Sequence, residues 1–256
     1  MNPTLTYFSA TFTTKRIVTL LAEQFQGETV IHDITLTPLV NEVSLAADDL
    51  LIVGIPVYAG RVPALAAERL AKFKGHNTPA VIVCVYGNRD YDDALLELKD
   101  IVETNGFRVV SAGAFIAQHS IFPEVGHNRP DAADLKLIQE FGSKSAKIIA
   151  NLPVTMQQTN IQVEGNKPYK TPKAVPLHPR TNKKCNACGA CAKQCPMNAI
   201  PETTPRKTLN DKCIACGRCI TICPQHARHF GGVLYKLAGR SFVQANAARR
   251  EPHLFY

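Results

Sequence analysis

Eight of the nine cysteines in this 256-residue sequence fall in two short runs with the same spacing. The runs begin at Cys185 and Cys213, 28 residues apart, and both follow the pattern CxxCxxCxxxCP. Thiolates at every third position can wrap one face of an iron-sulfur cubane in a tight turn, and the glycine in each run keeps backbone amides close to the sulfurs. The spacing therefore predicts iron-sulfur chemistry.

The fourth cysteine of each run predicts how the runs share their ligands. Where two such runs occur in one protein, the fourth cysteine of each ligates the cluster of the other. The predicted ligand sets for two [4Fe-4S] clusters are Cys185, Cys188, Cys191 and Cys223 for cluster 1, and Cys213, Cys216, Cys219 and Cys195 for cluster 2. Residues 181–230 resemble the bacterial two-cluster ferredoxins, which implies a small α+β domain.

Zinc is the main alternative for cysteines in CxxC pairs. A structural zinc ion needs four ligands in two separated pairs, which leaves the third cysteine of each run and the proline after the fourth unexplained. The segment also has few large apolar residues, so we expect the clusters to form its structural centre as well as its redox cargo. We therefore favour clusters over zinc.

Three loops in the first half of the chain carry residues suited to a phosphate and a flat ring. The hydroxyls of the segment SATFTT, followed by an expected helix, form a candidate phosphate cradle, although ordinary helix capping explains them equally well. Tyrosines in the other two loops can cover the faces of a ring, while small residues let the backbone approach its edge. The candidates are Ser9, Thr11, Thr13 and Thr14, then Pro56, Val57, Tyr58, Ala59 and Gly60, and then Tyr86, Gly87, Asn88 and Tyr91.

These loops require a scaffold of alternating strands and helices. Segments rich in Val, Ile and aromatic residues predict strands over 4–10, 28–35, 49–58, 79–87 and 106–116. Helical periodicity predicts helices over 13–27, 63–75, 91–106 and 129–152. This alternation predicts an α/β fold, a doubly wound parallel sheet that binds ligands at the carboxyl ends of its strands.

Residues 1–150 resemble a flavodoxin, on the segments YFSAT and YGNRDY. The resemblance implies a five-stranded flavodoxin-like sheet with FMN, its phosphate at the first loop and its isoalloxazine ring between the other two. Phe12 occupies the glycine position of the usual phosphate loop, S/T-x-T-G-x-T, and a bulky side chain tolerates positive φ poorly. We therefore expect either an ordinary φ with a shifted loop or weak flavin binding.

Charge and composition divide the chain. Residues 1–150 carry 13 Lys and Arg against 17 Asp and Glu, and residues 151–256 carry 16 against 4. We predict a flavodoxin-like domain (1–150), a proline-rich linker (151–180), a two-cluster domain (181–230) and a tail (231–256), for which a docking helix is one interpretation. Each oxidised cluster would remove about 2 units of positive charge, and no basic stripe is interleaved with aromatics. We therefore expect an acidic redox partner rather than nucleic acid.

Several function classes are excluded by composition. No apolar run approaches the roughly 20 residues of a membrane span, and the N-terminus lacks the pattern of a signal peptide. We expect a cytoplasmic protein whose cysteines bind metal rather than form disulfides. Cys84, in an apolar strand, is expected to be a buried small hydrophobe. A homodimer is left open.

The expected function is electron transfer between two [4Fe-4S] clusters and FMN, linking soluble redox proteins. One alternative is a flavin-dependent reductase of a small acceptor, fed by the clusters and using groups such as His119 or Arg89. Another is a ferredoxin with a flavin-free docking domain. Arg61 and Arg89 are candidates to stabilise an anionic flavin or plain surface residues, His119, Ser120 and His127 receive no role, and catalytic residues stay unassigned.

Overall fold

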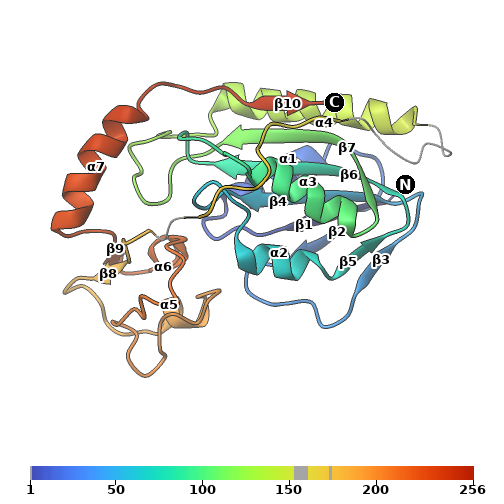
Figure 1. The fold of residues 1–256 in the computed structure, drawn as a ribbon. Coiled ribbons are helices and arrows are strands. Elements are labelled where there is room, and N and C mark those ends of the chain that lie inside the picture. Colours follow the sequence, from blue (N-terminus) through green and yellow to red (C-terminus); the bar gives the residue numbers. More distant parts are fainter. Residues whose placement is uncertain (1, 153–160, 173–174) are drawn as a thin grey trace.

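One sheet of six strands joins the first half of the chain to its last residues. The structure is a computed structural model that describes residues 2–152, 161–172 and 175–256. The strand order is β10-β7-β6-β4-β1-β2 (Figure 1). Neighbours pair in parallel, except that β10 runs antiparallel to β7. The strands are β1 (Pro3–Tyr7), β2 (Val30–Asp33), β4 (Leu50–Pro56), β6 (Thr78–Tyr86), β7 (Phe107–Ile116) and β10 (His253–Phe255).

The order of the five parallel strands confirms the predicted fold class. Numbered along the chain, they lie in the order 2-1-3-4-5, which is the flavodoxin-like arrangement. Two short strands, β3 (Val43–Leu45) and β5 (Phe73–Gly75), pair with each other beside the main sheet. The sequence pattern does not predict β3, β5 or β10, because three residues are too few to establish a period.

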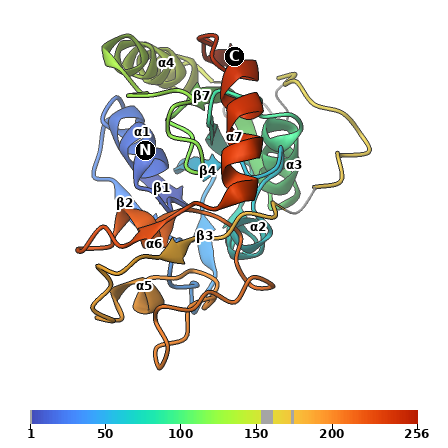
Figure 2. The same cartoon turned by 90° about the vertical axis from the view of Figure 1, so that its left-hand side faces the viewer.

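Helices cover both faces of the sheet, as its buried strands require. All nine residues of β6 are buried, including Cys84. Helices α1 (Thr13–Ala22) and α4 (Ala132–Ala150) pack on one face, and α2 (Ala64–Leu70) and α3 (Ala94–Thr104) on the other (Figure 2). Within the described ranges, no helix is long and apolar enough to cross a membrane.

The cysteine-rich segment folds as two related halves. Helix α5 (Ala190–Lys193) belongs to the first half and α6 (Arg218–Thr221) to the second, while β8 (Arg180–Thr181) pairs with β9 (Arg228–His229). Residues 28 apart share the same unusual backbone: Gly189 and Gly217 have φ of 77° and 78°. Ala187 and Ala215, and Asn198 and His226, also have positive φ in both halves. The sequence repeat is therefore a repeat of backbone conformation in a small α+β unit.

The tail connects the two parts. Helix α7 (Val233–Ala245) leaves the cysteine-rich unit and lies across the end of the sheet, and the chain then continues to β10 (Figures 1 and 2). Tyr235 and Phe242 of α7 pack on Phe122, which follows β7. Residues 153–160 and 173–174 of the predicted linker lie outside the described residues.

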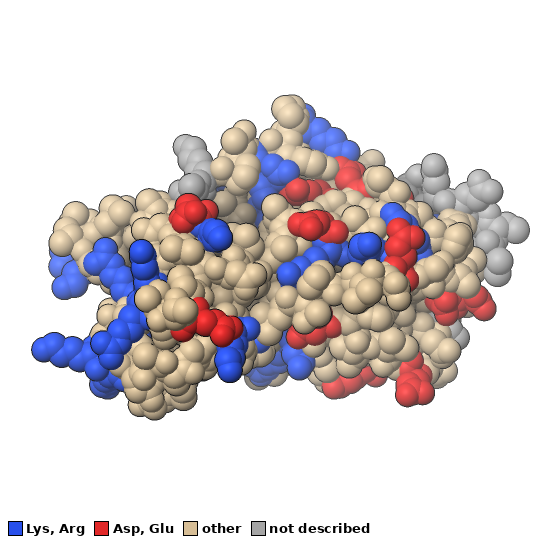
Figure 3. Space-filling view, turned by 90° about the horizontal axis from the view of Figure 1, so that it is seen from below, with Lys and Arg blue, Asp and Glu red and all other residues tan. Residues whose placement is uncertain are grey.

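The charge asymmetry of the sequence is visible on the surface. Figure 3 shows Lys and Arg side chains gathered over the end of the molecule that carries the cysteine-rich unit, whereas both signs are mixed over the sheet. The two parts therefore present different surfaces to a partner.

Candidate functional site

Two small cavities in the cysteine-rich unit are each lined by four cysteines. The first is lined by Cys185, Cys188, Cys191 and Cys223. The second is lined by Cys195, Cys213, Cys216 and Cys219. All eight are free of disulfides. Each cavity gathers the donor set that a [4Fe-4S] cluster uses, with the fourth cysteine of each run crossing to the other cavity.

The distance between the thiols of one site differs between a zinc ion and an iron-sulfur cluster. A zinc ion holds each thiolate at about 2.3 Å, so its ligands lie close together. Among the described residues, no group of three or more His, Cys, Asp or Glu could hold one metal ion. Thiolates around a cubane are farther apart, because each binds a different iron atom.

The two cavities differ in exposure, and we call the first the outer cavity and the second the inner cavity. Cys188 of the outer cavity is exposed, whereas Cys216 and Cys219 of the inner cavity are buried. Burial raises the pKa of the Cys216 and Cys219 thiols to about 12. Metal binding at the inner cavity must therefore displace protons from these thiols.

Backbone amides contact the fourth cysteine of each run in the same way. Ala199 N donates to Cys195 Sγ and Ala227 N donates to Cys223 Sγ, both at 3.3 Å. Burial disfavours the Cys223 thiolate, but the neighbouring N–H groups outweigh it and lower the pKa of this thiol. Such contacts stabilise negative charge on sulfur and are one means by which proteins set cluster potentials.

A larger cavity, of about 360 Å³, lies at the carboxyl ends of the parallel strands, and we call it the ring cavity. All three predicted loops contribute to it. Its lining includes ten of the predicted residues, namely Thr11, Thr13, Thr14, Pro56, Val57, Tyr58, Ala59, Gly60, Tyr86 and Gly87. Burial raises the pKa of Tyr86 to about 12, so its hydroxyl keeps its proton.

Ser9 and Tyr91 are not part of this lining, so their predicted contacts with a ligand stay predictions. Ser9 Oγ accepts a hydrogen bond from Lys15 N, in the first turn of α1, at 3.0 Å, although the N-cap residue itself is Phe12. The Tyr91 hydroxyl donates to Glu164 and lies 2.9 Å from His253 Nδ1. Tyr91 therefore connects the loop before α3 to two segments far along the chain.

The loop after β7 forms a further wall of the ring cavity, and the sequence pattern assigned its residues no role. Residues 117–122 line the ring cavity, His119 and Ser120 among them, whereas His127 does not. His119 Nδ1 accepts hydrogen bonds from Ile121 N at 3.2 Å and Phe122 N at 3.1 Å, which assigns the ring proton to Nε2. Burial lowers the pKa of His119 to about 4, so this ring is a neutral donor at neutral pH.

The two arginines near the predicted ring loops have different surroundings. Arg89 lines the ring cavity and forms an ion pair with Asp92 at 2.6 Å. Arg61 does not line it and instead forms an ion pair with Glu97 at 2.7 Å. Only Arg89 is therefore in position to influence a bound ring.

The remaining wall of the ring cavity comes from residues far along the chain. These are Val175, Pro176, Ile214, Ala215 and Phe242. Ile214 also lines the inner cavity, so one residue is shared by the two cavities. No local pattern indicates this arrangement, because it depends on how the cysteine-rich unit packs on the sheet.

The first loop keeps its left-handed turn despite the missing glycine. Phe12 adopts a φ of 65° directly before α1, where we expected an ordinary φ or a weakened site. A left-handed conformation costs a bulky residue about 1–2 kcal/mol. The loop still presents Thr11, Thr13 and Thr14 to the ring cavity beside the N-terminus of α1, which has no acidic residue in its first turn. These groups fit an anionic phosphate.

Arg218 explains why the Phe12 conformation is tolerated. Its guanidinium lies 4.5 Å from the centre of the Phe12 ring, in a cation-π contact. Its Nη1 donates to the carbonyls of Ser9 and Ala10 at 3.3 and 3.4 Å, and its Nη2 donates to Gln194 Oε1 at 2.8 Å. Arg218 stands between Cys216 and Cys219 in the sequence, so it joins the inner cavity to the candidate phosphate loop.

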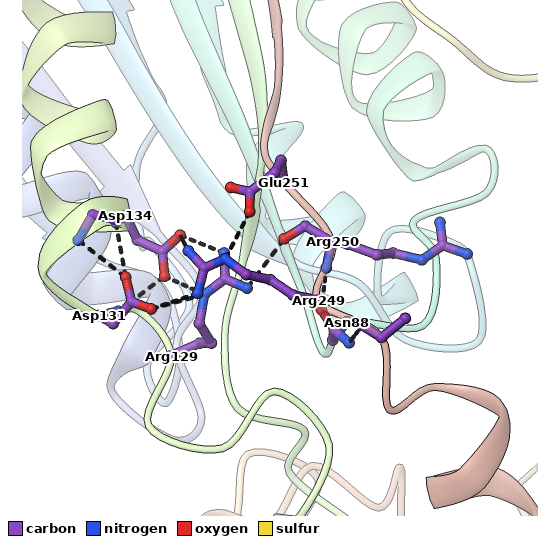
Figure 4. Close-up of polar contacts among 9 residues, drawn as sticks. Asn88, Arg129, Asp131, Asp134, Arg249, Arg250 and Glu251 are labelled. Carbon is purple, nitrogen blue, oxygen red and sulfur yellow. Dashed lines mark hydrogen bonds and ion pairs between the residues drawn. The ribbon is translucent and has the colours of Figure 1, made fainter.

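Two connections hold the cysteine-rich unit in place, and the first is the tail. Buried Arg129 pairs with Asp134, while Arg249 of the tail donates to Asp131 Oδ2 at 2.6 Å (Figure 4). The hydrogen bond from Arg249 holds the pKa of Asp131 well below its usual value. The tail is therefore fastened to the start of α4.

The Asn88 side chain contacts the same tail and is not part of the ring-cavity lining, so its predicted contact with a ligand stays a prediction. Its Nδ2 donates to the carbonyls of Asn246 and Ala248 at 2.9 and 2.8 Å. Its Oδ1 accepts from Arg250 N at 3.1 Å (Figure 4). Asn88 has a positive φ of 58°, a conformation that Asn tolerates better than most residues.

The second connection is the segment before the cysteine-rich unit. Asp93 accepts hydrogen bonds from Asn166 N at 2.8 Å and Lys170 N at 2.6 Å. Arg61 Nη1 donates to the Lys170 carbonyl at 2.6 Å. The segment over 161–172 is therefore bound to the loop before α3, and the unit is held from both sides.

One family model and several solved structures are similar to parts of this chain. Residues 184–228 match the family described as a 4Fe-4S dicluster domain. Solved structures that resemble this chain include a flavodoxin from the domain Archaea (11% identity, TM-score 0.40, covering 59% of this chain and all of the flavodoxin). Others are a flavodoxin of Streptococcus pneumonia TIGR4 (12%, 0.41, 57% and 98%) and one of Fusobacterium nucleatum bound to flavin mononucleotide (16%, 0.36, 58% and 95%). A search of curated proteins gave no match.

The parallel strand order 2-1-3-4-5 is the feature that defines the fold of the sheet. Residues 184–228 match a 4Fe-4S dicluster domain, and the residues before them form the five parallel strands of a flavodoxin-like sheet. The chain therefore joins a flavodoxin-like fold to a segment that matches a 4Fe-4S dicluster domain.

Proposed function

We propose that the chain is an electron carrier with one [4Fe-4S] cluster in each cysteine-lined cavity and FMN in the ring cavity. When bound, the clusters supply one-electron transfer and FMN can exchange one or two electrons. The main support for this proposal is Ile214, which lines both the inner cavity and the ring cavity, so the two cavities are direct neighbours. Cys188 at the outer cavity is exposed, which suits contact with a partner.

The residues of the ring cavity support a flavin and its phosphate. Thr11, Thr13 and Thr14 would hold the phosphate with the N-terminus of α1, while Tyr58 and Tyr86 line the ring region. His119 offers a neutral N–H donor at the same wall. The volume of about 360 Å³ is near the lower limit of ligand pockets, which favours one enclosed ligand over a ligand with a second substrate.

The proposal is tested by quantifying cofactors in protein purified without oxygen. We expect about eight irons and about one FMN per chain, with broad thiolate-to-iron absorption under the flavin bands. Zinc in place of iron would overturn the cluster assignment, and eight irons without flavin would overturn the FMN assignment in favour of a docking domain. Turnover of a small acceptor without a protein partner would favour a reductase. Cytoplasmic localisation and oligomeric state stay predictions.

Matched variants separate ligands from other buried cysteines. Cys216→Ala should lose about four irons, because it removes one ligand of the inner cluster. Cys84→Ala also replaces a buried cysteine but should keep all the iron. For the phosphate, FMN should bind more tightly than riboflavin, and equal affinities would contradict the role given to the Thr11 loop.

A further inference from the structure

The outer cavity is bordered by a positively charged hollow. Arg206 Nη2 donates to the Cys185 carbonyl at 2.6 Å, so Arg206 lies at the rim of the outer cavity. A hollow of about 370 Å³ begins there, lined by Arg180 and Arg206 on one side and by the start of α7 on the other. A Cβ added at Gly232 would lie 3.2 Å from Arg180 Nη1, so this guanidinium rests against the first turn of α7.

Helix α7 continues this surface with apolar side chains that face solvent. Val233, Leu234 and Leu237 are 76%, 53% and 66% exposed, although the opposite side of α7 packs on the sheet domain. Val233, Lys236, Leu237 and Arg240 are separated by three and four residues, so they share one face of the helix. Val233 and Leu234 also line the hollow. We call Arg180, Arg206 and this part of α7 the docking face.

No negative charge balances the docking face within the part of the chain that the structure describes. Neither Asp nor Glu lines the hollow, and Arg180, Lys236 and Arg240 take part in none of the ion pairs of the described residues. Residues 175–248 contain only Glu202 and Asp211 as acidic side chains. Figure 3 shows the positive side chains at this end of the molecule.

We propose that the docking face binds an acidic redox protein that exchanges electrons with the outer cluster, an inference that rests on the proposed function. Opposite charge would guide the partner, and the exposed apolar side chains would exclude water at the centre of the contact. A second copy of this chain would bring like charges together. Nucleic acid would gain little from the apolar side chains at the centre of the face.

The test measures binding of the full chain, loaded with its clusters, to an acidic plant-type [2Fe-2S] ferredoxin by calorimetry. The charge-reversal variant is Lys236→Glu with Arg240→Glu, and its matched control is Lys136→Glu with Lys147→Glu on exposed positions of α4. We expect the α7 variant to raise Kd at least tenfold at low ionic strength and the control less than twofold. Leu237→Ser should weaken binding with little change in its salt dependence.

Three results of the binding comparison would overturn the docking face even if the wild type binds the ferredoxin. These are equal Kd values for the α7 variant and the wild type, binding of a basic cytochrome c as tight as that of the ferredoxin, or competition by duplex DNA. Quantification of iron and acid-labile sulfide shows separately whether the clusters are present. Unloaded wild-type protein would refute the proposed function, whereas loaded protein that does not bind the ferredoxin would refute the docking face alone.

Discussion

Replacing Arg218 by Ala should weaken flavin binding although Arg218 does not line the ring cavity. Three of its contacts reach the first loop: the hydrogen bonds of 3.3 and 3.4 Å to Ser9 and Ala10 and the stacking on Phe12 at 4.5 Å. At about 0.5 kcal/mol for each long bond and about 1 kcal/mol for the stacking, they contribute about 2 kcal/mol. Without these contacts the first loop can relax from its strained conformation. Part of the free energy of flavin binding must then restore that conformation, so binding becomes weaker.

The expected effect is a rise in the FMN Kd of up to about 30-fold, measured by quenching of flavin fluorescence. Arg218→Lys keeps the charge but loses the planar fork, so its effect should be intermediate. Arg240→Ala is the control, because it removes an exposed arginine of α7. A Kd for Arg218→Ala within twofold of wild type, with all iron retained, would refute the reasoning.

A double-mutant cycle tests the strain at Phe12 itself. Phe12→Gly removes both the stacking and the cost of a φ of 65°, so its own effect on flavin affinity should be small. In that background, Arg218→Ala should cost about 1 kcal/mol less than in the wild type, because the stacking is already absent. Additive effects would show that the two side chains act independently.

Further predictions concern the clusters, His119 and the tail. Chelation of iron should unfold residues 181–230 but leave the sheet intact in hydrogen exchange, because the apolar cluster there consists of little more than Cys191, Ala192, Ile200 and Cys219. Burial lowers the pKa of His119 from 6.5 in the unfolded chain to about 4 in the folded protein. Between these pH values the unfolded state binds more protons, so the free energy of unfolding should fall by about 2 kcal/mol from pH 7 to pH 4.5. Urea unfolding of His119→Asn should lack this dependence. Asn88→Gly loses three hydrogen bonds to the tail, about 3 kcal/mol in total, and limited proteolysis should then cut the tail faster.

The sequence predicts those features that depend on local spacing. Strands such as β6 are continuous apolar runs, and the 28-residue repeat reappears as matching backbone at Gly189 and Gly217. Local spacing does not predict which side chains pair when they are far apart in the sequence. Tyr91 donates a hydrogen bond to Glu164, 73 residues away, and Asn88 donates one to the Asn246 carbonyl, 158 residues away. Neither side chain lines the ring cavity, although residues next to them in the sequence do. Phe12 adopts the positive φ that we expected a bulky residue to avoid, and Arg218 contacts its ring from the other domain, which no local pattern reveals.

The antiparallel strand at the sheet edge gives the fusion an unusual topology. Because His253–Phe255 pair with Ala112–Ala114, the ferredoxin part is an insertion between two strands of one sheet and not an appendage after it. During synthesis, the edge of β7 remains uncovered until the whole insertion has been made. An exposed strand edge can pair with other chains, so β10 also acts as a seal against aggregation. Loss of β10 should therefore affect solubility before it affects any cofactor.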